Sequence, residues 1–92
     1  MEADPRVDLL GRSGNVAIIS VSDRAFPFVA LPGDSLKGFL EDILEAEEEI
    51  HSSRISDAEF SLRDLRENLQ SMLAFYAQVC SERNIGLPYH DE

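Results

Sequence analysis

The chain has 92 residues, 43% hydrophobic and 28% charged, which is enough apolar material for one compact core and argues against disorder along its whole length. Its 18 acidic and 8 basic residues give a net charge of −10, which argues against direct nucleic-acid binding, because Lys and Arg contacts to phosphates dominate that affinity. The single cysteine, Cys80, excludes an internal disulfide, and with no long apolar run it predicts a cytoplasmic protein with no membrane partner.

Residues 6–31 have the pattern of a β-meander of about three short strands. The run from Val16 to Val21 is apolar and β-branched, as in a central strand, and Ser13-Gly14-Asn15 before it is a turn signal. Residues 26–31 predict the third strand. Pro27 places this strand at a sheet edge or beside a bulge, because proline donates no hydrogen bond to a neighbouring strand.

Residues 35–53 predict a helix, with Asp34 or Ser35 as its cap. Its apolar residues recur every three or four positions and form one stripe, which consists of Leu36, Phe39, Leu40, Ile43, Leu44 and Ile50. The opposite side is mostly acidic and consists of Gly38, Glu41, Asp42, Glu45, Glu48 and Glu49. We therefore expect the apolar stripe to be buried and the acidic side to face solvent.

Residues 57–84 predict a second, longer helix, preceded by the capping-box spacing of Ser56 and Glu59. Its expected buried stripe consists of Ala58, Leu62, Leu65, Leu69, Met72, Leu73, Tyr76, Val79 and Cys80. Asn84-Ile85-Gly86-Leu87-Pro88 contains residues that tolerate the left-handed region and then a proline, which ends the helix and begins a tail over residues 85–92.

Together these elements predict an α+β fold, in which a small antiparallel sheet carries a C-terminal antiparallel helix hairpin on one face. We expect residues 1–92 to form a single domain, with residues 1–5 disordered. The second helix, about 40 Å long, exceeds strands of about 17–20 Å. Part of it must extend past the sheet, where the first helix, the tail or a second subunit would cover it.

Four short motifs follow one another along the chain: Asn15-Val16-Ala17, Arg24-Ala25-Phe26-Pro27, Gly33-Asp34-Ser35-Leu36 and Ile85-Gly86-Leu87-Pro88-Tyr89. In this order they resemble a family of small uncharacterised bacterial proteins of about this length, with N-x-A, R-x-F-P and G-D-S-L motifs. The resemblance covers most of the chain. It implies a bacterial origin and no particular activity.

The G-D-S-L string around Ser35 also marks a family of esterases, in which a nucleophilic serine lies between a strand and a helix. Such a serine needs a histidine oriented by an acid, and those esterases resemble a larger doubly wound fold with D-x-x-H near the C-terminus. Here His90 has Leu87 rather than Asp three residues before it. We therefore expect that the protein is not an enzyme and that it has no catalytic, cofactor-binding or metal-binding residues.

Three single residues allow more than one interpretation. Glu47 falls inside the apolar stripe, so it pairs with Arg63 or Arg66 across the hairpin, is exposed at a frayed helix end, or is functional. His51 follows Glu47 by four residues, but no third ligand lies nearby, and a histidine in the last turn favours the helix dipole. Cys80 on the buried stripe predicts a packed, unreactive thiol.

The predicted partner-binding residues are acidic residues of the first helix and two aromatic residues of the second: Glu41, Asp42, Glu45, Glu48, Glu49, Phe60 and Phe75. Like charges four residues apart destabilise a helix, so the acidic cluster is either a solvated face or a surface for a basic partner. The two phenylalanines lie off the stripe of the second helix, so they form an interface or are covered by the tail or by the loop after the first helix.

These features favour a small acidic protein-binding domain, an immunity- or antitoxin-like inhibitor that covers the basic surface of a partner such as a toxin or a nuclease. One alternative is a non-catalytic homodimeric scaffold or regulatory protein that uses the extended part of the second helix and Phe75 as its interface. A weaker alternative is a phage-type acidic mimic of nucleic acid.

Overall fold

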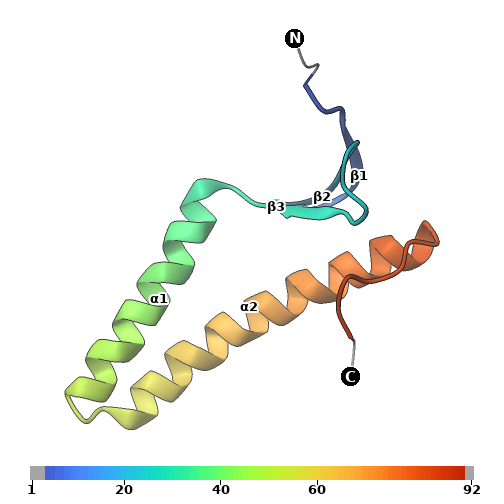
Figure 1. The fold of residues 1–92 in the computed structure, drawn as a ribbon. Helices are drawn as coiled ribbons and strands as arrows, with labels where there is room; N and C mark the ends of the chain where they lie inside the picture. The colour runs from blue at the N-terminus through green and yellow to red at the C-terminus, as the bar shows by residue number, and fades with distance from the viewer. Residues whose placement is uncertain (1–3, 91–92) are drawn as a thin grey trace. The chain divides into compact units, whose positions relative to one another are not determined.

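The computed structural model describes residues 4–90 and contains three strands followed by two helices (Figure 1). These elements are β1 (Val7–Ser13), β2 (Val16–Val21), β3 (Phe28–Ala30), α1 (Gly33–His51) and α2 (Ile55–Glu82). The predicted α+β class is confirmed. Parts of two predictions, disorder over residues 1–5 and a tail over 85–92, fall on residues 1–3 and 91–92, which lie outside the described residues.

The chain divides into two compact units. Among the described residues, the sheet unit contains those up to Leu31 together with those from Leu73 onward, and thus the last part of α2. The hairpin unit contains Pro32–Met72, and thus α1 and the first part of α2.

In the sheet unit, the three strands form an antiparallel sheet in the order β1-β2-β3. Val16–Val21 is the central strand, as its apolar β-branched sequence predicts. Gly14 and Asn15 form the two-residue turn between Ser13 and Val16, and Gly14 has φ +57°, the sign that tight hairpin turns need and that glycine adopts without strain. The third strand is an edge strand, as Pro27 predicts, and is limited to three residues.

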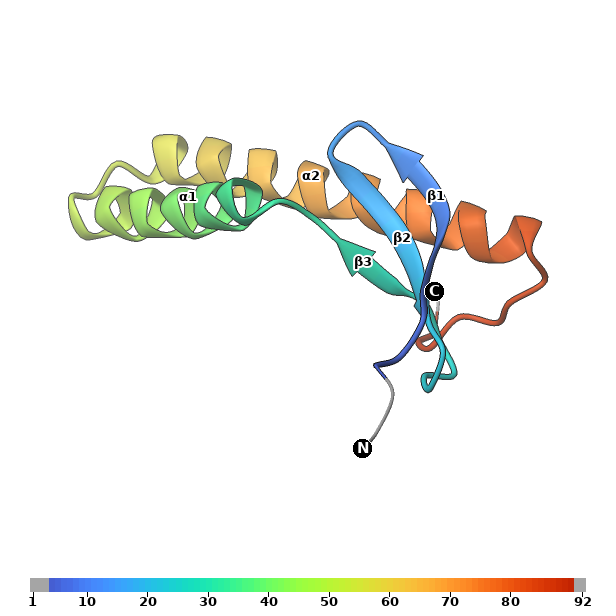
Figure 2. The same cartoon turned by 90° about the horizontal axis from the view of Figure 1, so that it is seen from above.

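The last turns of α2 cross one face of this sheet (Figure 2), and the side chains between helix and sheet form the core of the sheet unit. The buried residues are Ile18, Tyr76, Val79 and Cys80, with Leu10, Val16, Val29, Phe75, Ile85 and Leu87 packed around them. The register of β1 shifts between Leu9 and Gly11, and a methyl group added to Gly11 would lie 2.9 Å from Val79 Cγ2. The helix therefore approaches the sheet closely at the irregularity in β1.

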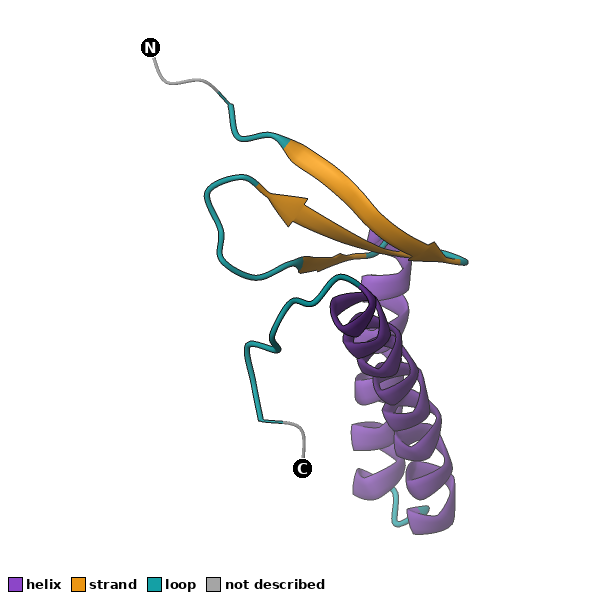
Figure 3. Ribbon diagram, turned by 90° about the vertical axis from the view of Figure 1, so that its right-hand side faces the viewer, coloured by secondary structure: helices purple, strands orange, loops and turns teal. Residues whose placement is uncertain are grey.

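Two long-range hydrogen bonds fasten the sheet to the end of α2. The buried Tyr76 hydroxyl donates to the Pro27 carbonyl at 2.8 Å, and Arg83 Nη2 donates to the Leu10 carbonyl at 2.8 Å. Burial raises the pKa of the Tyr76 phenol, with a smaller contribution from Cys80. After α2 the chain turns back beside the sheet (Figure 3), because Asn84 has φ +57° and the Ile85 amide donates to the Cys80 carbonyl at 2.8 Å.

In the hairpin unit, α1 and the first part of α2 run in opposite directions and are joined by Ser52–Arg54 (Figure 1). The cap position of α1 is Pro32, which makes no side-chain capping hydrogen bond, so the predicted cap at Asp34 or Ser35 is wrong. Ser56 is likewise inside α2, which begins at Ile55, so it is not the cap that the sequence predicts.

The buried face of α1 is not the predicted one. Ala46 and Glu49 are buried there, whereas Leu36, Leu40, Ile43, Leu44 and Ile50 are exposed. Two local features turn this face toward α2. Ser53 adopts φ +61° and the Arg54 amide donates to the Glu49 carbonyl at 2.7 Å, which fixes the direction of the turn. Ala46 and Ala58 are both buried, and their small side chains allow the helices to approach closely.

The predicted stripe of α2 is partly correct. Ala58, Leu65, Tyr76, Val79 and Cys80 are buried. Leu62, Leu69 and Leu73 are exposed, because no other described element covers their part of the stripe. Replacing Leu69 or Leu73 by alanine in the isolated chain should therefore leave no large cavity.

Candidate functional site

An acidic groove lies between α1 and α2 in the hairpin unit. It has a volume of about 220 Å³. The residues that line it are Asp42, Glu45 and Glu49 from α1, and Asp57, Phe60, Ser61 and Asp64 from α2. Five carboxylates therefore converge on a small volume beside one aromatic ring and one hydroxyl.

The groove has a buried wall formed by Glu49, which is only 6% exposed. Ser61 Oγ donates a hydrogen bond of 2.7 Å to Glu49 Oε1. A buried carboxylate needs such a partner, because removal from water without a replacement hydrogen bond is costly. The predicted exposure of Glu49 is wrong: the turn at Ser53 points its face of α1 toward α2.

The other acidic residues of the predicted surface separate into two groups. Asp42 and Glu45 line the groove, with Asp42 half-buried and Glu45 exposed. Glu41 and Glu48 are exposed but lie outside it, and Glu48 Oε1 accepts a hydrogen bond from Ser52 Oγ at 3.2 Å.

The two phenylalanines have different environments. Phe60 is 70% exposed at the groove. Phe75 is half-buried and packs in the core of the sheet unit, where its Cζ is 3.4 Å from the position of a Cβ added to Gly11. Phe75 is therefore covered rather than exposed, as one of the two sequence interpretations allowed, but the core of the sheet unit covers it and not the loop after the first helix.

Sequence reasoning missed the contribution of α2 to the groove, which is Asp57, Ser61 and Asp64. These residues recur every three or four positions, so they share one side of the helix. That spacing is visible in the sequence, but only the register of the hairpin shows that this side faces the acids of α1.

Glu47 is exposed, as one of its three sequence interpretations allowed, and it does not pair with Arg63 or Arg66. Within residues 4–90, the ion pairs join Arg6 to Asp8 at 3.2 Å and Arg54 to Asp57 at 3.9 Å. Arg63 and Arg66 instead line a depression of about 440 Å³ on α2, together with Glu59 and Leu62. The pair does not form because Glu47 lies off the face of α1 that contacts α2.

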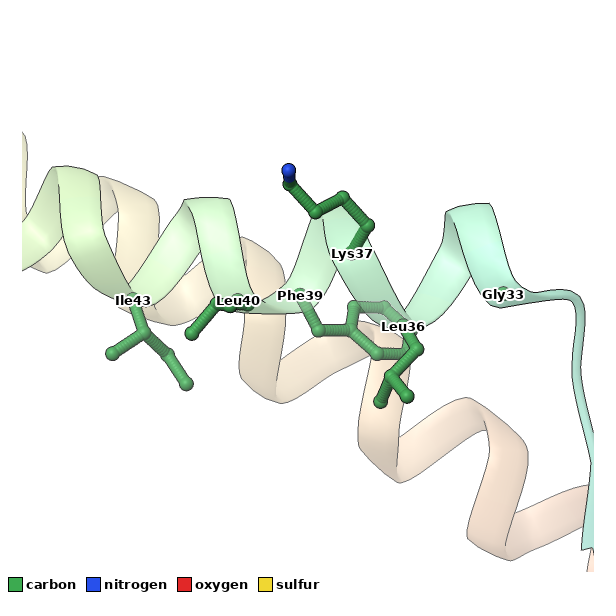
Figure 4. Close-up of a pocket in the computed structure, with 6 residues that line it drawn as sticks. All are labelled: Gly33, Leu36, Lys37, Phe39, Leu40 and Ile43. Carbon is green, nitrogen blue, oxygen red and sulfur yellow. The ribbon is translucent and has the colours of Figure 1, made fainter.

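A second depression, of about 540 Å³, lies on α1 and is almost entirely apolar (Figure 4). It is lined by Gly33, Leu36, Lys37, Phe39, Leu40 and Ile43. Figure 4 shows Leu36 and Ile43 projecting from one side of the helix and Lys37 from the other. Aliphatic side chains of α1 are thus exposed to solvent at positions where the sequence predicts buried ones.

Ser35, His51 and Cys80 are further residues that the sequence analysis considered for chemistry. Ser35 and His51 lie at opposite ends of α1, about 24 Å apart along its axis. Cys80 is 1% exposed and forms no disulfide bond, as expected for a packed thiol. Over residues 4–90, no group of three or more His, Cys, Asp or Glu side chains is arranged to hold a metal ion, and this includes the acidic groove.

Comparisons with known proteins identify a family but no relative of known activity. Neither the curated proteins nor the solved structures include a match to this chain. Judged over the described residues, neither α1 nor α2 combines the length and the hydropathy that a bilayer-crossing helix needs. Residues 2–89 match the model of a family of unknown function, DUF6959, and the chain belongs to that family.

Proposed function

We propose that this protein is a small protein-binding domain that inhibits a basic partner, in the manner of immunity proteins and antitoxins. The acidic groove of the hairpin unit is its binding site. The observation that carries the proposal is the convergence of five carboxylates on a groove of about 220 Å³ beside the exposed ring of Phe60.

This chemistry suits an arginine or lysine side chain of a partner protein. Carboxylates accept charge-assisted hydrogen bonds from a guanidinium, often two at a time. The face of a phenylalanine ring attracts the same cation when the two are stacked. Glu45, Asp64 and Phe60 are exposed, so an incoming side chain reaches all three without a change in the fold.

Charge beyond the groove supports the same kind of partner. Residues 34–57 contain eight acidic and two basic residues, so they carry −6 of the total charge of −10. A field of this kind accelerates association with a cationic surface and keeps other acidic proteins away. An aromatic residue beside the groove can supply the apolar anchor that most protein interfaces need in addition to charge.

A binding role is also consistent with the absence of a histidine among the residues that line the groove. Of the residues that line it, only Ser61 carries a hydroxyl, and that hydroxyl donates to Glu49. A serine nucleophile needs a base such as histidine to accept its proton. We therefore propose inhibition by occlusion rather than an enzymatic activity, and a cytoplasmic location in keeping with a lone, buried cysteine.

A photocrosslinking amino acid placed at position 60 tests the proposal. The matched control places it at Ser81, which is exposed on the last turn of the same helix and far from the groove residues in sequence. We expect a covalent product with one basic protein from position 60 only. The purified partner should then lose its activity when the wild-type protein is added in equimolar amount.

Two results would contradict the proposal. A product of equal yield from Ser81 would show that capture does not involve the groove. A captured partner that is acidic, or whose activity is unchanged by the wild-type protein, would exclude an inhibitor of a basic target.

A further inference from the structure

The hairpin unit has a second face, opposite the acidic groove, that is apolar and uncovered. Each helix contributes one row of exposed aliphatic residues spaced by seven: Leu36, Ile43 and Ile50 on α1, and Ile55, Leu62 and Leu69 on α2. Their exposed fractions range from 42% to 64%. We call these six residues the outer row.

Three positions after the outer row, each helix has an inner row that is more covered. It consists of Phe39 and Ala46 on α1 and of Ala58, Leu65 and Met72 on α2. The spacing of the two rows is that of positions a and d in a heptad. In a four-helix bundle both positions point into the core, but the two helices of one hairpin cover only the inner row.

Both halves of the outer row lie on the same side of the hairpin. On each helix the outer row precedes the inner row by three residues, which rotates it by the same angle about the helix axis. The two helices are antiparallel and face each other through their inner rows (Figure 1). The outer rows of both helices are therefore turned toward the same side of the hairpin. Most groove residues precede inner-row positions by one or four residues, as Glu45 and Asp42 precede Ala46, and this rotates them to the other side. Glu49 reaches that side because it follows Ala46 by three residues. The hairpin is therefore acidic on one side and apolar on the other.

We propose that the outer row binds a second copy of this chain, and that the two hairpins form a four-helix bundle in which α1 lies against α2 of the second copy. Seven-residue spacing on both helices fits a bundle partner with the same spacing, which a second copy supplies. Burying six half-exposed aliphatic residues on each copy gives the interface an apolar centre.

Charge selects the pairing of the helices within this bundle. Helix α1 has seven acidic residues and one lysine, so two copies of α1 would repel each other if they were in contact. Helix α2 carries Arg63 and Arg66 next to Leu62. Contact between α1 and α2 of the second copy therefore brings Arg63 and Arg66, with Glu59 beside them, to the acidic residues of α1.

The register of the hairpin identifies the pair. The hydrogen bond between Glu49 and Ser61 places these two residues at the same height along the hairpin axis. Glu47 precedes Glu49 by two residues and Arg63 follows Ser61 by two, so in an antiparallel hairpin Glu47 and Arg63 also lie at one height. A two-fold axis parallel to the helices keeps the levels unchanged. It thus brings Glu47 of each copy to the level of Arg63 of the second copy, with Arg66 one turn away.

Sedimentation equilibrium of the whole chain at several concentrations tests the dimer. We expect a mass of about twice 10.3 kDa for the wild-type protein. Ile43→Glu and Leu62→Glu, each in the middle of the outer row, should give monomers with the helix content of the wild type. Phe60→Glu makes the same change at an exposed residue on the acidic side and should remain a dimer. A monomeric wild-type protein, or a Phe60→Glu monomer beside dimeric Ile43→Glu, would overturn the proposal.

A charge swap tests the pairing of the helices without adding a carboxylate to the apolar row. Glu47→Arg and Arg63→Glu should each weaken the dimer, on the order of tenfold in its dissociation constant, and the double variant should recover the wild-type value. The single variants change the net charge in opposite directions, so a general charge effect would weaken one dimer and strengthen the other. That result, or two single variants with wild-type affinity, would exclude the contact between α1 and α2.

Discussion

The hydroxyl of Ser61 on α2 donates a hydrogen bond of 2.7 Å to the carboxylate of Glu49 on α1. This contact joins the two helices of the hairpin at the level of the acidic groove. It also satisfies a carboxylate that is almost completely removed from water. The stability of the hairpin and the shape of the groove therefore depend on the same pair of residues.

Replacing Ser61 by alanine should lower the free energy of unfolding by about 1–3 kcal/mol, because Glu49 would keep its burial and lose its hydrogen-bond donor. Urea denaturation at one fixed protein concentration measures this change. Ser71→Ala, at an exposed position on the same helix, is the control and should change stability by less than about 0.5 kcal/mol. Equal effects of the two substitutions would show that the bond contributes nothing specific.

Two glycines should respond to alanine with opposite signs. Gly11→Ala should destabilise the protein by about 1–3 kcal/mol, because the new methyl group would lie 2.9 Å from Val79 Cγ2 in the packed core. Gly38→Ala should stabilise it by about 0.5–1 kcal/mol, because Gly38 is inside α1 and an added Cβ meets no atom within 4 Å. Thermal denaturation of both variants measures the difference. A neutral Gly11→Ala would contradict the close approach of α2 to β1.

The buried phenol of Tyr76 should make the protein sensitive to alkaline pH. Its pKa is raised above the ordinary value of 10.0, so the folded state favours the protonated form more strongly than the unfolded state does. The stability that this preference contributes is present below pH 10.0 and is lost as the pH rises above it.

Tyr76→Phe should therefore reduce the loss of stability above pH 10.0. At neutral pH it should cost about 1–3 kcal/mol, because the Pro27 carbonyl loses its donor. Denaturant titrations at neutral and at alkaline pH measure both effects. Tyr89→Phe removes the other tyrosine and should leave the alkaline loss in place. An unchanged alkaline loss in Tyr76→Phe would assign it to other groups.

Much of the fold follows from local sequence signals. The β-branched run from Val16 to Val21 is the central strand, and Gly14 occupies the turn before it. Both helices lie within two residues of their predicted bounds, since periodicity and helix-ending residues such as Asn84 act locally. The placement of the third strand at the sheet edge follows from the missing amide of Pro27.

The buried face of α1 does not follow from such signals. Periodicity identifies an apolar stripe, but it does not say which element covers that stripe. The turn at Ser53 and the small side chains of Ala46 and Ala58 decide which face meets α2. A hairpin with the outer row exposed is also what a chain that pairs with a second copy would show, and a single sequence does not distinguish intramolecular from intermolecular burial.

The candidate site could be predicted only in part. The acids of α1 are evident as a cluster, and Asp42 and Glu45 do line the groove. The acids of α2 belong to the same site only through the register that Glu49 and Ser61 set. The sequence predicts Phe75 either in an interface or under the tail or the loop after the first helix, and the close packing at Gly11 places it in the core of the sheet unit.

The central claim, that the acidic groove binds a basic protein, is tested most directly by association rates of charge variants with the partner captured at position 60. Glu45→Lys with Asp64→Lys reverses two exposed charges of the groove, and Glu67→Lys with Glu82→Lys makes the same change in net charge at exposed positions of α2 outside it.

We expect the groove variant to associate at least about tenfold more slowly than the wild type at low salt, and the control variant to lose much less. High salt should bring the wild type and the groove variant closer together, because it screens charges on the surface. Equal rates for the groove and control variants at low salt would contradict the claim, since binding would then depend on net charge and not on the groove.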